Sequence, residues 1–288
     1  MMGIVLALLA ALIDSLSVIF VRKRLDNSNF FSAVFVTTAI GSIIFWPLTL
    51  LFTSFRTVNV EGILFFAITG ILAPGISRLC YFKGVDVVGV SVNASIHAAY
   101  PVYSSIFAAL LLGEVIASEN WIGIICVVVG VVFVQSSLSK SKAGFKRVRK
   151  GILFPMLASL TIATSYITRK YGLSICNEPL LGVAIGYSLS SFLYIIVLVC
   201  SGTARGHFSL SKDFRLFWKA GACLSFGWLL VFYALSYERV SIVTSLMQTQ
   251  SLFVLFFSHL LLKESEHISS RLIIGTILVL IGVVFSVQ

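Results

Sequence analysis

Charged residues are scarce in this chain. Asp, Glu, Lys and Arg make up 11% of its 288 residues, whereas 58% are hydrophobic. Soluble domains carry roughly a quarter charged residues and need a polar exterior, so this composition excludes a water-soluble fold. The charges are separated by apolar runs of about 20 residues, which is the length of a helix that crosses roughly 30 Å of hydrocarbon. The runs do not alternate as barrel strands do, so we expect an all-α integral membrane protein.

Motifs for common chemistries are also missing. The sequence has no G-x-S-x-G, H-E-x-x-H or Walker motif, which argues against transport powered by ATP and against the familiar hydrolytic reactions. Its five cysteines and four histidines are not spaced as metal ligands or redox pairs, so no metal and no cofactor are expected. The net charge of +10 is scattered over short loops and one tract, and nucleic acid is therefore not an expected partner.

The apolar runs predict ten transmembrane helices. Only one linker differs in composition, the basic stretch "SLSKSKAGFKRVRK", and it separates five spans from five. We therefore predict a first repeat at 1–137, a basic linker at 138–150 and a second repeat at 151–288. The predicted spans are about 2–21, 31–53, 60–82, 87–112, 118–137, 151–170, 178–201, 214–235, 240–262 and 270–287.

The two halves resemble each other at an offset near 150 residues. "GVSVNASIHAAYPVYSSIFAALLLGE" aligns with "RVSIVTSLMQTQSLFVLFFSHLLLKE", and "FVRKRL" echoes "ITRKYGL". Because each half holds an odd number of spans, the second copy must enter the membrane upside down. This inverted-repeat plan is typical of secondary transporters.

These motifs resemble the EamA-type drug/metabolite transporter superfamily. "LLLGE" and "LLLKE" close the fourth span of each half, and a glycine-rich fifth span follows each. The resemblance covers nearly the whole chain. It implies a basket in which spans 1 to 4 and 6 to 9 line a central cavity, with spans 5 and 10 at the periphery. The chain departs from the family at Ile13-Asp14, where such proteins often carry Trp-Gly.

The distribution of basic residues predicts the orientation. Sixteen Lys and Arg residues fall in loops after the odd-numbered spans, and four fall in the opposite loops, namely Arg56, Arg169, Lys170 and Arg239. The positive-inside rule then places both termini outside the cytoplasm, in a multi-pass protein of the cell (inner) membrane.

Ionisable residues within spans are the first candidate site residues, because each costs about 2.5–3.5 kcal/mol at the bilayer centre. Asp14 lies eight residues before Arg22, or about 12 Å from that end of the helix. It is either a substrate-amine or proton site, or a structural partner of Arg78 in the third span. Arg78 in turn either faces the cavity, where it would favour an anionic substrate, or extends to the headgroups.

The fourth span carries a polar stripe. Asn93, His97, Tyr100 and Ser104 follow the spacing i, i+4, i+7, i+11 and share one helix face. Pro101 removes the amide that would bond the carbonyl of His97, so that carbonyl is expected to be freed. The stripe either faces a wet cavity or forms hydrogen bonds that hold helices together.

The matching stretch of the ninth span supplies amides at Gln248 and Gln250. Aromatic residues at Tyr103, Tyr166 and Trp228 are candidates for the cavity walls, and Trp228 is the repeat counterpart of Arg78. The candidate substrate-binding or coupling residues are therefore Asp14, Arg78, Asn93, His97, Tyr100, Tyr103, Tyr166, Trp228, Gln248 and Gln250.

Taken together, these features predict a secondary transporter of a small polar or amphipathic organic metabolite, an exporter or exchanger that works by alternating access, and not an enzyme. A channel or an intramembrane enzyme acting on a lipid-soluble substrate is the alternative. The expected partners are a small-molecule substrate, the lipid bilayer and, as a candidate coupling ion, protons. The chain is expected to act as a monomer or homodimer.

Overall fold

The computed structural model describes residues 1–25, 27–54, 58–88, 90–137, 151–200, 209–262 and 270–287. Within these ranges the regular structure is helical throughout. The predicted linker at 138–150 lies outside the described residues, and the repeat boundaries on either side of it stay predictions. The first half contains α1 (Met2–Leu25), α2 (Phe30–Phe52), α3 (Val60–Gly70), η2 (Ile71–Ile76), α4 (Ser77–Val88), α5 (Val90–His97), α6 (Tyr100–Leu111) and α7 (Ser118–Ser137).

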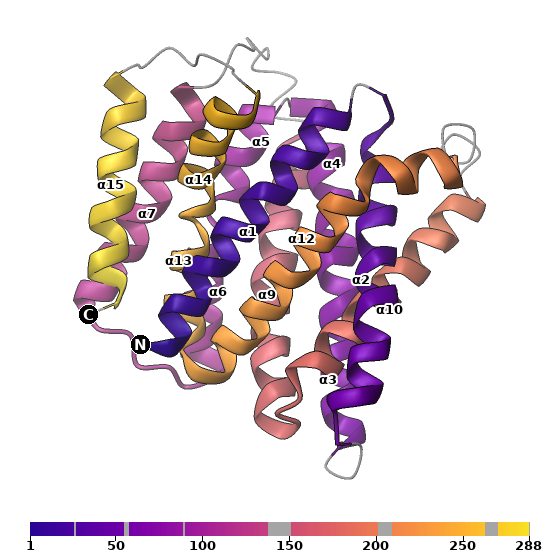
Figure 1. Cartoon of the computed structure of the whole chain (residues 1–288). Helices are drawn as coiled ribbons and strands as arrows, with labels where there is room; N and C mark the ends of the chain where they lie inside the picture. Colours follow the sequence, from indigo (N-terminus) through magenta and orange to yellow (C-terminus); the bar gives the residue numbers. More distant parts are fainter. Residues whose placement is uncertain are drawn as a thin grey trace.

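The second half repeats this order with fewer interruptions. Its helices are α9 (Leu153–Ile175), α10 (Pro179–Cys200), α12 (Leu210–Tyr237), α13 (Val240–Met247), α14 (Gln250–Phe257), η3 (Ser258–Leu262) and α15 (Ser270–Val287). The helices stand side by side as one bundle, and both chain termini lie at the same end of it (Figure 1).

The two halves are inserted in opposite senses. In the pair formed by the fifth helices, a Cβ on Gly123 of α7 would lie 2.4 Å from Ser286 N of α15, and one on Gly130 would lie 2.7 Å from Gly275 O. Residue numbers thus rise along α7 as they fall along α15, so these equivalent helices are antiparallel. The fold class is confirmed: an all-α integral membrane fold of two inverted five-helix repeats.

Contacts between the halves come in symmetric pairs. α1 packs along α12 just as α3 and α4 pack along α9, while α2 packs on α10 and α6 on α13. The pair α7 and α15 stands at one edge of the bundle (Figure 1). Along α15, Ile273, Ile277, Leu280 and Val284 are exposed at helical spacing, as expected for a face in contact with lipid.

Among the described residues, nine helical segments are long and apolar enough to cross a membrane. The tenth span is α9, whose 23 residues extend about 35 Å. α9 is less apolar because it packs against helices of both halves, so its buried Ser159, Ser165 and Arg169 face protein rather than lipid.

Two predicted span boundaries are wrong. The third span was expected to end near residue 82, but α4 continues to Val88 and places Lys83 inside a helix. The sixth was expected to end near residue 170, but α9 continues to Ile175 and encloses Arg169. Lys83 and Arg169 therefore lie inside helices, whereas the count of basic residues had placed both of them in loops.

Candidate functional site

Asp14 lies in the contact between α1 and α12. α1 presents small buried residues to its neighbour, including Ala7, Ala10 and Ala11, which allow α12 to approach closely. The carboxylate lies against Gly227 of α12, where a Cβ would be 1.9 Å from Asp14 Oδ1. Asp14 is only 5% exposed, and its Oδ1 has no hydrogen-bond partner.

Arg169 on α9 is the second buried charge, and the sequence analysis did not select it. It is 1% exposed, and its guanidinium carbon lies 5.0 Å from the ring centroid of Tyr166, 4.4 Å from that of Trp228 and 4.6 Å from that of Phe232. Its Nε and Nη2 have no hydrogen-bond partner. Three ring faces thus stabilise the cation while part of its donor fork is left unused.

Arg78 lies on α4 and is half-buried. Its Nη1 donates to Thr37 Oγ1 of α2 at 3.3 Å. The charges of Arg78 and Arg169 both act on Asp14, yet neither guanidinium forms an ion pair with it within 4.0 Å. A direct Asp14–Arg78 ion pair, one of the two alternatives for these residues, is thus not formed in this structure.

A series of aromatic contacts connects the predicted site residues. Tyr81 meets His97 edge to face at 5.0 Å between ring centroids, and His97 meets Tyr100 at 5.6 Å. Tyr100 stacks on Tyr166 at 6.0 Å, and Tyr166 is one of the rings around Arg169. The structure therefore brings His97, Tyr100, Tyr166 and, through Arg169, Trp228 into one cluster.

Part of the polar stripe on the fourth span joins helices. The helix breaks at Ala98 and Ala99, where the sequence placed the effect of Pro101. The freed carbonyls are satisfied by side chains from the second half: Ser159 Oγ donates to His97 O at 3.3 Å, and Gln248 Nε2 donates to Ala98 O at 2.6 Å.

Further bonds cross from α6 to α13. Tyr100 OH donates to Thr244 O at 3.5 Å, and Ser104 Oγ donates to Thr244 Oγ1 at 3.0 Å. Asn93, by contrast, is fully buried against Gly84 with no partner for its Oδ1 or Nδ2. Along this one stripe, then, Tyr100 and Ser104 bond to a neighbouring helix while Asn93 keeps its polar atoms unused.

Tyr103 and Gln250 stand apart from the cluster. Both are half-buried; Tyr103 packs against the main hydrophobic core, and the structure describes no side-chain hydrogen bond for Gln250. No ring contact or side-chain hydrogen bond joins either residue to the aromatic series, although Tyr103 packs on the same core as Tyr100 and Tyr166.

The third span is broken as well, which the sequence analysis missed. Ala73 adopts an extended conformation (φ −147°, ψ 127°) between α3 and α4. α10 supplies the missing partners: Ser190 Oγ donates to Gly70 O at 2.7 Å, and Tyr194 OH donates to Pro74 O at 2.6 Å. Non-helical backbone at membrane depth requires such partners, because lipid offers none.

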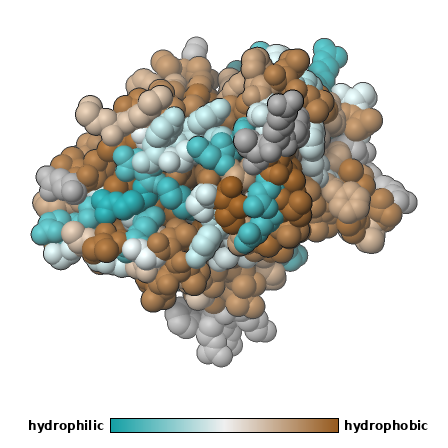
Figure 2. Space-filling model, turned by 90° about the horizontal axis from the view of Figure 1, so that it is seen from below, coloured by the Kyte–Doolittle hydropathy of each residue, from teal (hydrophilic) through white to brown (hydrophobic). Residues whose placement is uncertain are grey.

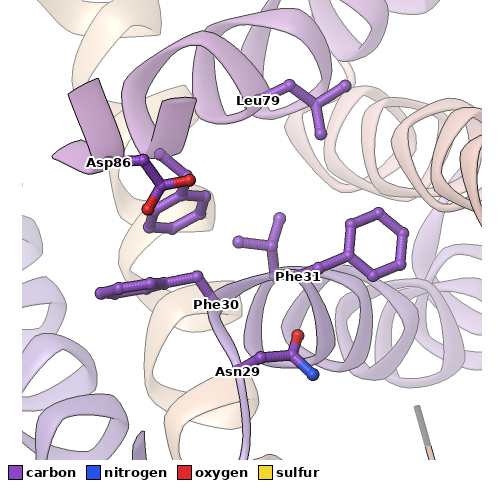
Figure 3. Close-up of a pocket in the computed structure, with 7 residues that line it drawn as sticks. Asn29, Phe30, Phe31, Leu79 and Asp86 are labelled. Atoms are coloured by element: carbon purple, nitrogen blue, oxygen red, sulfur yellow. The ribbon is translucent and has the colours of Figure 1, made fainter. Parts of the chain in front are cut away.

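A pocket of about 280 Å³ lies between the start of α2 and α4, away from the buried charges. Figure 3 shows Leu79 projecting from one helix toward Phe31 on the other, with Phe30, Asn29 and Asp86 at the opposite side of the opening. It contains none of the predicted site residues. Because unpaired buried charges are expensive, the Asp14–Arg169 region, rather than this mostly apolar pocket, is the candidate site.

The end of the bundle that carries both termini is polar in its middle and hydrophobic around it (Figure 2). Here Glu114 binds the amino end of α13: its Oε1 accepts from Val240 N at 2.6 Å, and its Oε2 accepts from Ser241 N at 3.2 Å and Ser241 Oγ at 2.8 Å. Lys170 Nζ donates to Glu238 O at 2.9 Å. These bonds hold α6, α9, α12 and α13 together at this end.

Two inverted five-helix halves, with broken helices and buried opposite charges where the halves meet, define a multi-pass membrane protein of the inverted-repeat class. The chain belongs to the EamA-like transporter family. The sequence model of this family matches residues 1–136 and, a second time, residues 149–288. The resemblance seen in the sequence is thereby confirmed.

One relative and one solved structure are similar to this chain over almost its whole length. A protein of Archaeoglobus fulgidus named as an uncharacterized transporter is 25% identical over 287 residues, which cover 98% of this chain and 97% of that protein. A crystal structure that is 11% identical covers 98% of this chain and 95% of its own with a TM-score of 0.83, a likeness of fold alone. The protein is a membrane transporter, and these findings point away from an enzyme.

Proposed function

We propose that the protein is a secondary carrier that moves a small polar or amphipathic organic solute by alternating access, as an exporter or an exchanger. The observation that supports this best is the pair Asp14 and Arg169. One comes from each half, both are buried, and both keep polar atoms without partners. Intramembrane charges of this kind mark substrate or ion pathways.

The inverted halves supply a reason for two states. Most contacts between the halves have a counterpart of nearly the same kind, so exchanging the conformations of the halves yields a second state of similar energy that is open to the other side. The breaks at Ala73 and at Ala98 place unwound backbone within spans, which is where such carriers bend around a load.

In this proposal Asp14, Arg78 and His97 carry the charge and proton chemistry, while Asn93, Tyr100, Gln248 and Gln250 orient the load. The bonds from Gln248 to Ala98 O and from Tyr100 to Thr244 O would then have to rearrange during the cycle. A carrier whose helices slide past one another needs such exchangeable bonds.

We also propose that both termini lie outside the cytoplasm in the cell (inner) membrane, with the chain acting as a monomer or homodimer. Once Arg169 and Lys83 are removed from the count, three basic residues remain in loops or helix ends on the terminal side, against fifteen on the other. Labelling of a cysteine placed at residue 2, in a variant whose five native cysteines are replaced by alanine, with a membrane-impermeant maleimide in intact cells tests this. Labelling only after lysis would reverse the orientation.

The carrier is tested with purified protein in proteoliposomes. Amino acids, nucleosides, amines and sugar phosphates are first screened for thermal stabilisation, because a ligand that binds only the folded state raises stability. Solutes that stabilise are then tested for counterflow. Saturable counterflow is expected; conductance without counterflow would indicate a channel, and conversion of the solute in detergent would indicate an enzyme.

Protons are the proposed coupling ion, with Asp14 as the exchange site. The charged groups that act on it are Arg78 and Arg169, and the neutral titratable side chains within electrostatic range of it are Tyr100, Tyr166, Tyr187 and Cys223. Asp14→Asn should abolish the pH dependence of uptake into proteoliposomes. Unchanged pH dependence would remove Asp14 from this role.

A further inference from the structure

We propose that Glu114 is a positioning residue of the transport cycle. Its carboxylate holds α6 against α13, and this contact closes the end of the bundle that carries the chain termini. The contact alternates with an equivalent one between α5 and α14, which closes the opposite end in the other state. This rests on the proposed carrier function and identifies the contact that changes when access changes sides.

The two broken spans of the fourth and ninth positions supply these four helices. The spans meet at their breaks, where Gln248 Nε2 donates to Ala98 O at 2.6 Å. From there α6 and α13 extend toward the end with the termini, and α5 and α14 extend toward the opposite end (Figure 1). In the repeat alignment α6 is the counterpart of α14, and α13 is the counterpart of α5. An equivalent pair of helices is therefore available on each side of the breaks.

The contact is formed at one end only. α6 packs along α13, and Ser104 Oγ donates to Thr244 Oγ1 between them at 3.0 Å. In the part of the chain that the structure describes, α5 and α14 do not pack along each other. Tyr100 of α6 donates to Thr244 O, whereas Gln250, its counterpart on α14, forms no side-chain hydrogen bond with a described residue. This pair is the exception to the symmetry of the halves, because α1 packs on α13 and α14 just as α9 packs on α5 and α6.

Glu114 joins the outer ends of α6 and α13. Its carboxylate accepts hydrogen bonds from Val240 N, Ser241 N and Ser241 Oγ at 2.6, 3.2 and 2.8 Å. The first amides of a helix have no partner within the helix and carry partial positive charge, so a carboxylate stabilises them. These bonds break when α6 leaves α13. Because Glu114 is half-buried, water can then reach its carboxylate, and the contact can open and close reversibly.

Two further bonds join the segment around Glu114 to the second half. Tyr171 OH of α9 donates to Leu111 O, and Arg239 Nη1, from the residue before α13, donates to Val115 O at 2.9 Å. The segment that carries the carboxylate is thus held on both sides of Glu114 while the contact is formed.

Cysteine reporters test the contact in a variant whose five native cysteines are replaced by alanine, in lipid nanodiscs so that the reagent reaches both faces. Ser104→Cys reports on the α6–α13 contact, where the native side chain is fully buried. Ala94→Cys reports on the opposite end, because Ala94 is the counterpart of Thr244. The rate of modification by a small cationic methanethiosulfonate is measured at each reporter.

Glu114→Ala should raise the rate at residue 104 by about tenfold or more and leave the rate at residue 94 unchanged or lower. Hydrogen bonds to a charged group are worth at least the roughly 1.4 kcal/mol that a tenfold change in an equilibrium constant requires. Glu114→Gln keeps the size and one acceptor oxygen and should give a smaller rise. Glu119→Ala is the matched control, an exposed glutamate at the start of α7, and should change neither rate.

A rise at both reporters would show a loosened fold rather than a shift between two states, and no rise at residue 104 would show that Glu114 does not hold the contact. Either result would overturn the proposal. Because Glu114→Gln is measured in parallel, the test remains decisive if Glu114→Ala does not fold.

Paired cysteines test the alternation with Glu114 intact. Ser104→Cys with Thr244→Cys should form a disulfide rapidly on oxidation, and Ala94→Cys with Val254→Cys, the counterpart pair on α5 and α14, should form one more slowly. Glu114→Ala should slow the first and speed the second. Absence of a disulfide in either pair would overturn the proposal. These readouts need no substrate, so their failure leaves counterflow untouched, whereas the absence of counterflow refutes the carrier and not the contact.

Discussion

The contact between α3 and α10 makes opposite predictions for two glycines that face each other. A Cβ added at Gly70 would lie 2.3 Å from Gly186 O and 2.6 Å from Gly186 Cα, well inside van der Waals contact with backbone atoms that cannot turn away. A Cβ added at Gly186 would meet Gly70 Cα at 3.7 Å, an ordinary contact. Gly70→Ala should therefore push the helices apart, whereas Gly186→Ala should fit.

The two substitutions should have different effects on the free energy of unfolding. Overpacking costs about 1–3 kcal/mol, and separating the helices also strains the bond from Ser190 Oγ to Gly70 O, for which interhelical bonds average roughly 0.6 kcal/mol. We expect Gly70→Ala to lower the free energy of unfolding by about 1–3 kcal/mol. Gly186→Ala should be neutral or stabilising, because alanine is favoured over glycine in a helix interior by up to about 1 kcal/mol.

Unfolding of the purified variants in detergent, followed by loss of helical circular dichroism against SDS concentration, measures both effects. Each variant is the control for the other, because both substitutions add one methyl group to the same interface. Equal destabilisation by the two substitutions, or no effect of Gly70→Ala, would refute the packing described here.

Three further substitutions test individual polar contacts in the same unfolding assay. Glu114→Ala removes the acceptor for three donors at the start of α13 and should lower the free energy of unfolding by about 1–3 kcal/mol. Glu119→Ala is the control, because its side chain is exposed, and it should change stability by less than about 0.5 kcal/mol. Similar losses in the two variants would contradict the bonds from Glu114 to α13. Lys170→Met removes the donor to Glu238 O and should cost about 1–2 kcal/mol, a value that Lys170→Arg should partly restore. Gln248→Leu leaves Ala98 O without its donor and should cost about 0.6–1.7 kcal/mol; a stabilised variant would show that this bond is not made.

Most of the architecture could be predicted because its causes are local or periodic. Span length follows from the thickness of the hydrocarbon core, and the inverted arrangement follows from an odd number of spans per repeat. The break in the third span has a non-local cause. Pro74 is visible in the sequence. The extended conformation of Ala73, however, is tolerated because the hydroxyls of Ser190 and Tyr194 on α10 donate hydrogen bonds to the carbonyls left free at the break.

The candidate site was predicted only in part for a similar reason. Asp14 stands out because an acid interrupts an apolar run. Arg169 was assigned to a loop because it precedes Lys170 near the expected end of a span, and only the extension of α9 to Ile175 places it six residues, or about 9 Å, inside the helix. The Ser and Thr residues interspersed along the span before the basic pair were the signal that this span faces protein.

The comparison of the repeats shows that the buried charges are not symmetric between the halves, although the contacts between the halves come in symmetric pairs. Arg22 is the counterpart of Arg169 in the repeat alignment, but it is exposed near the end of α1, whereas Arg169 is buried. α1 thus supplies only the carboxylate and α9 only the guanidinium.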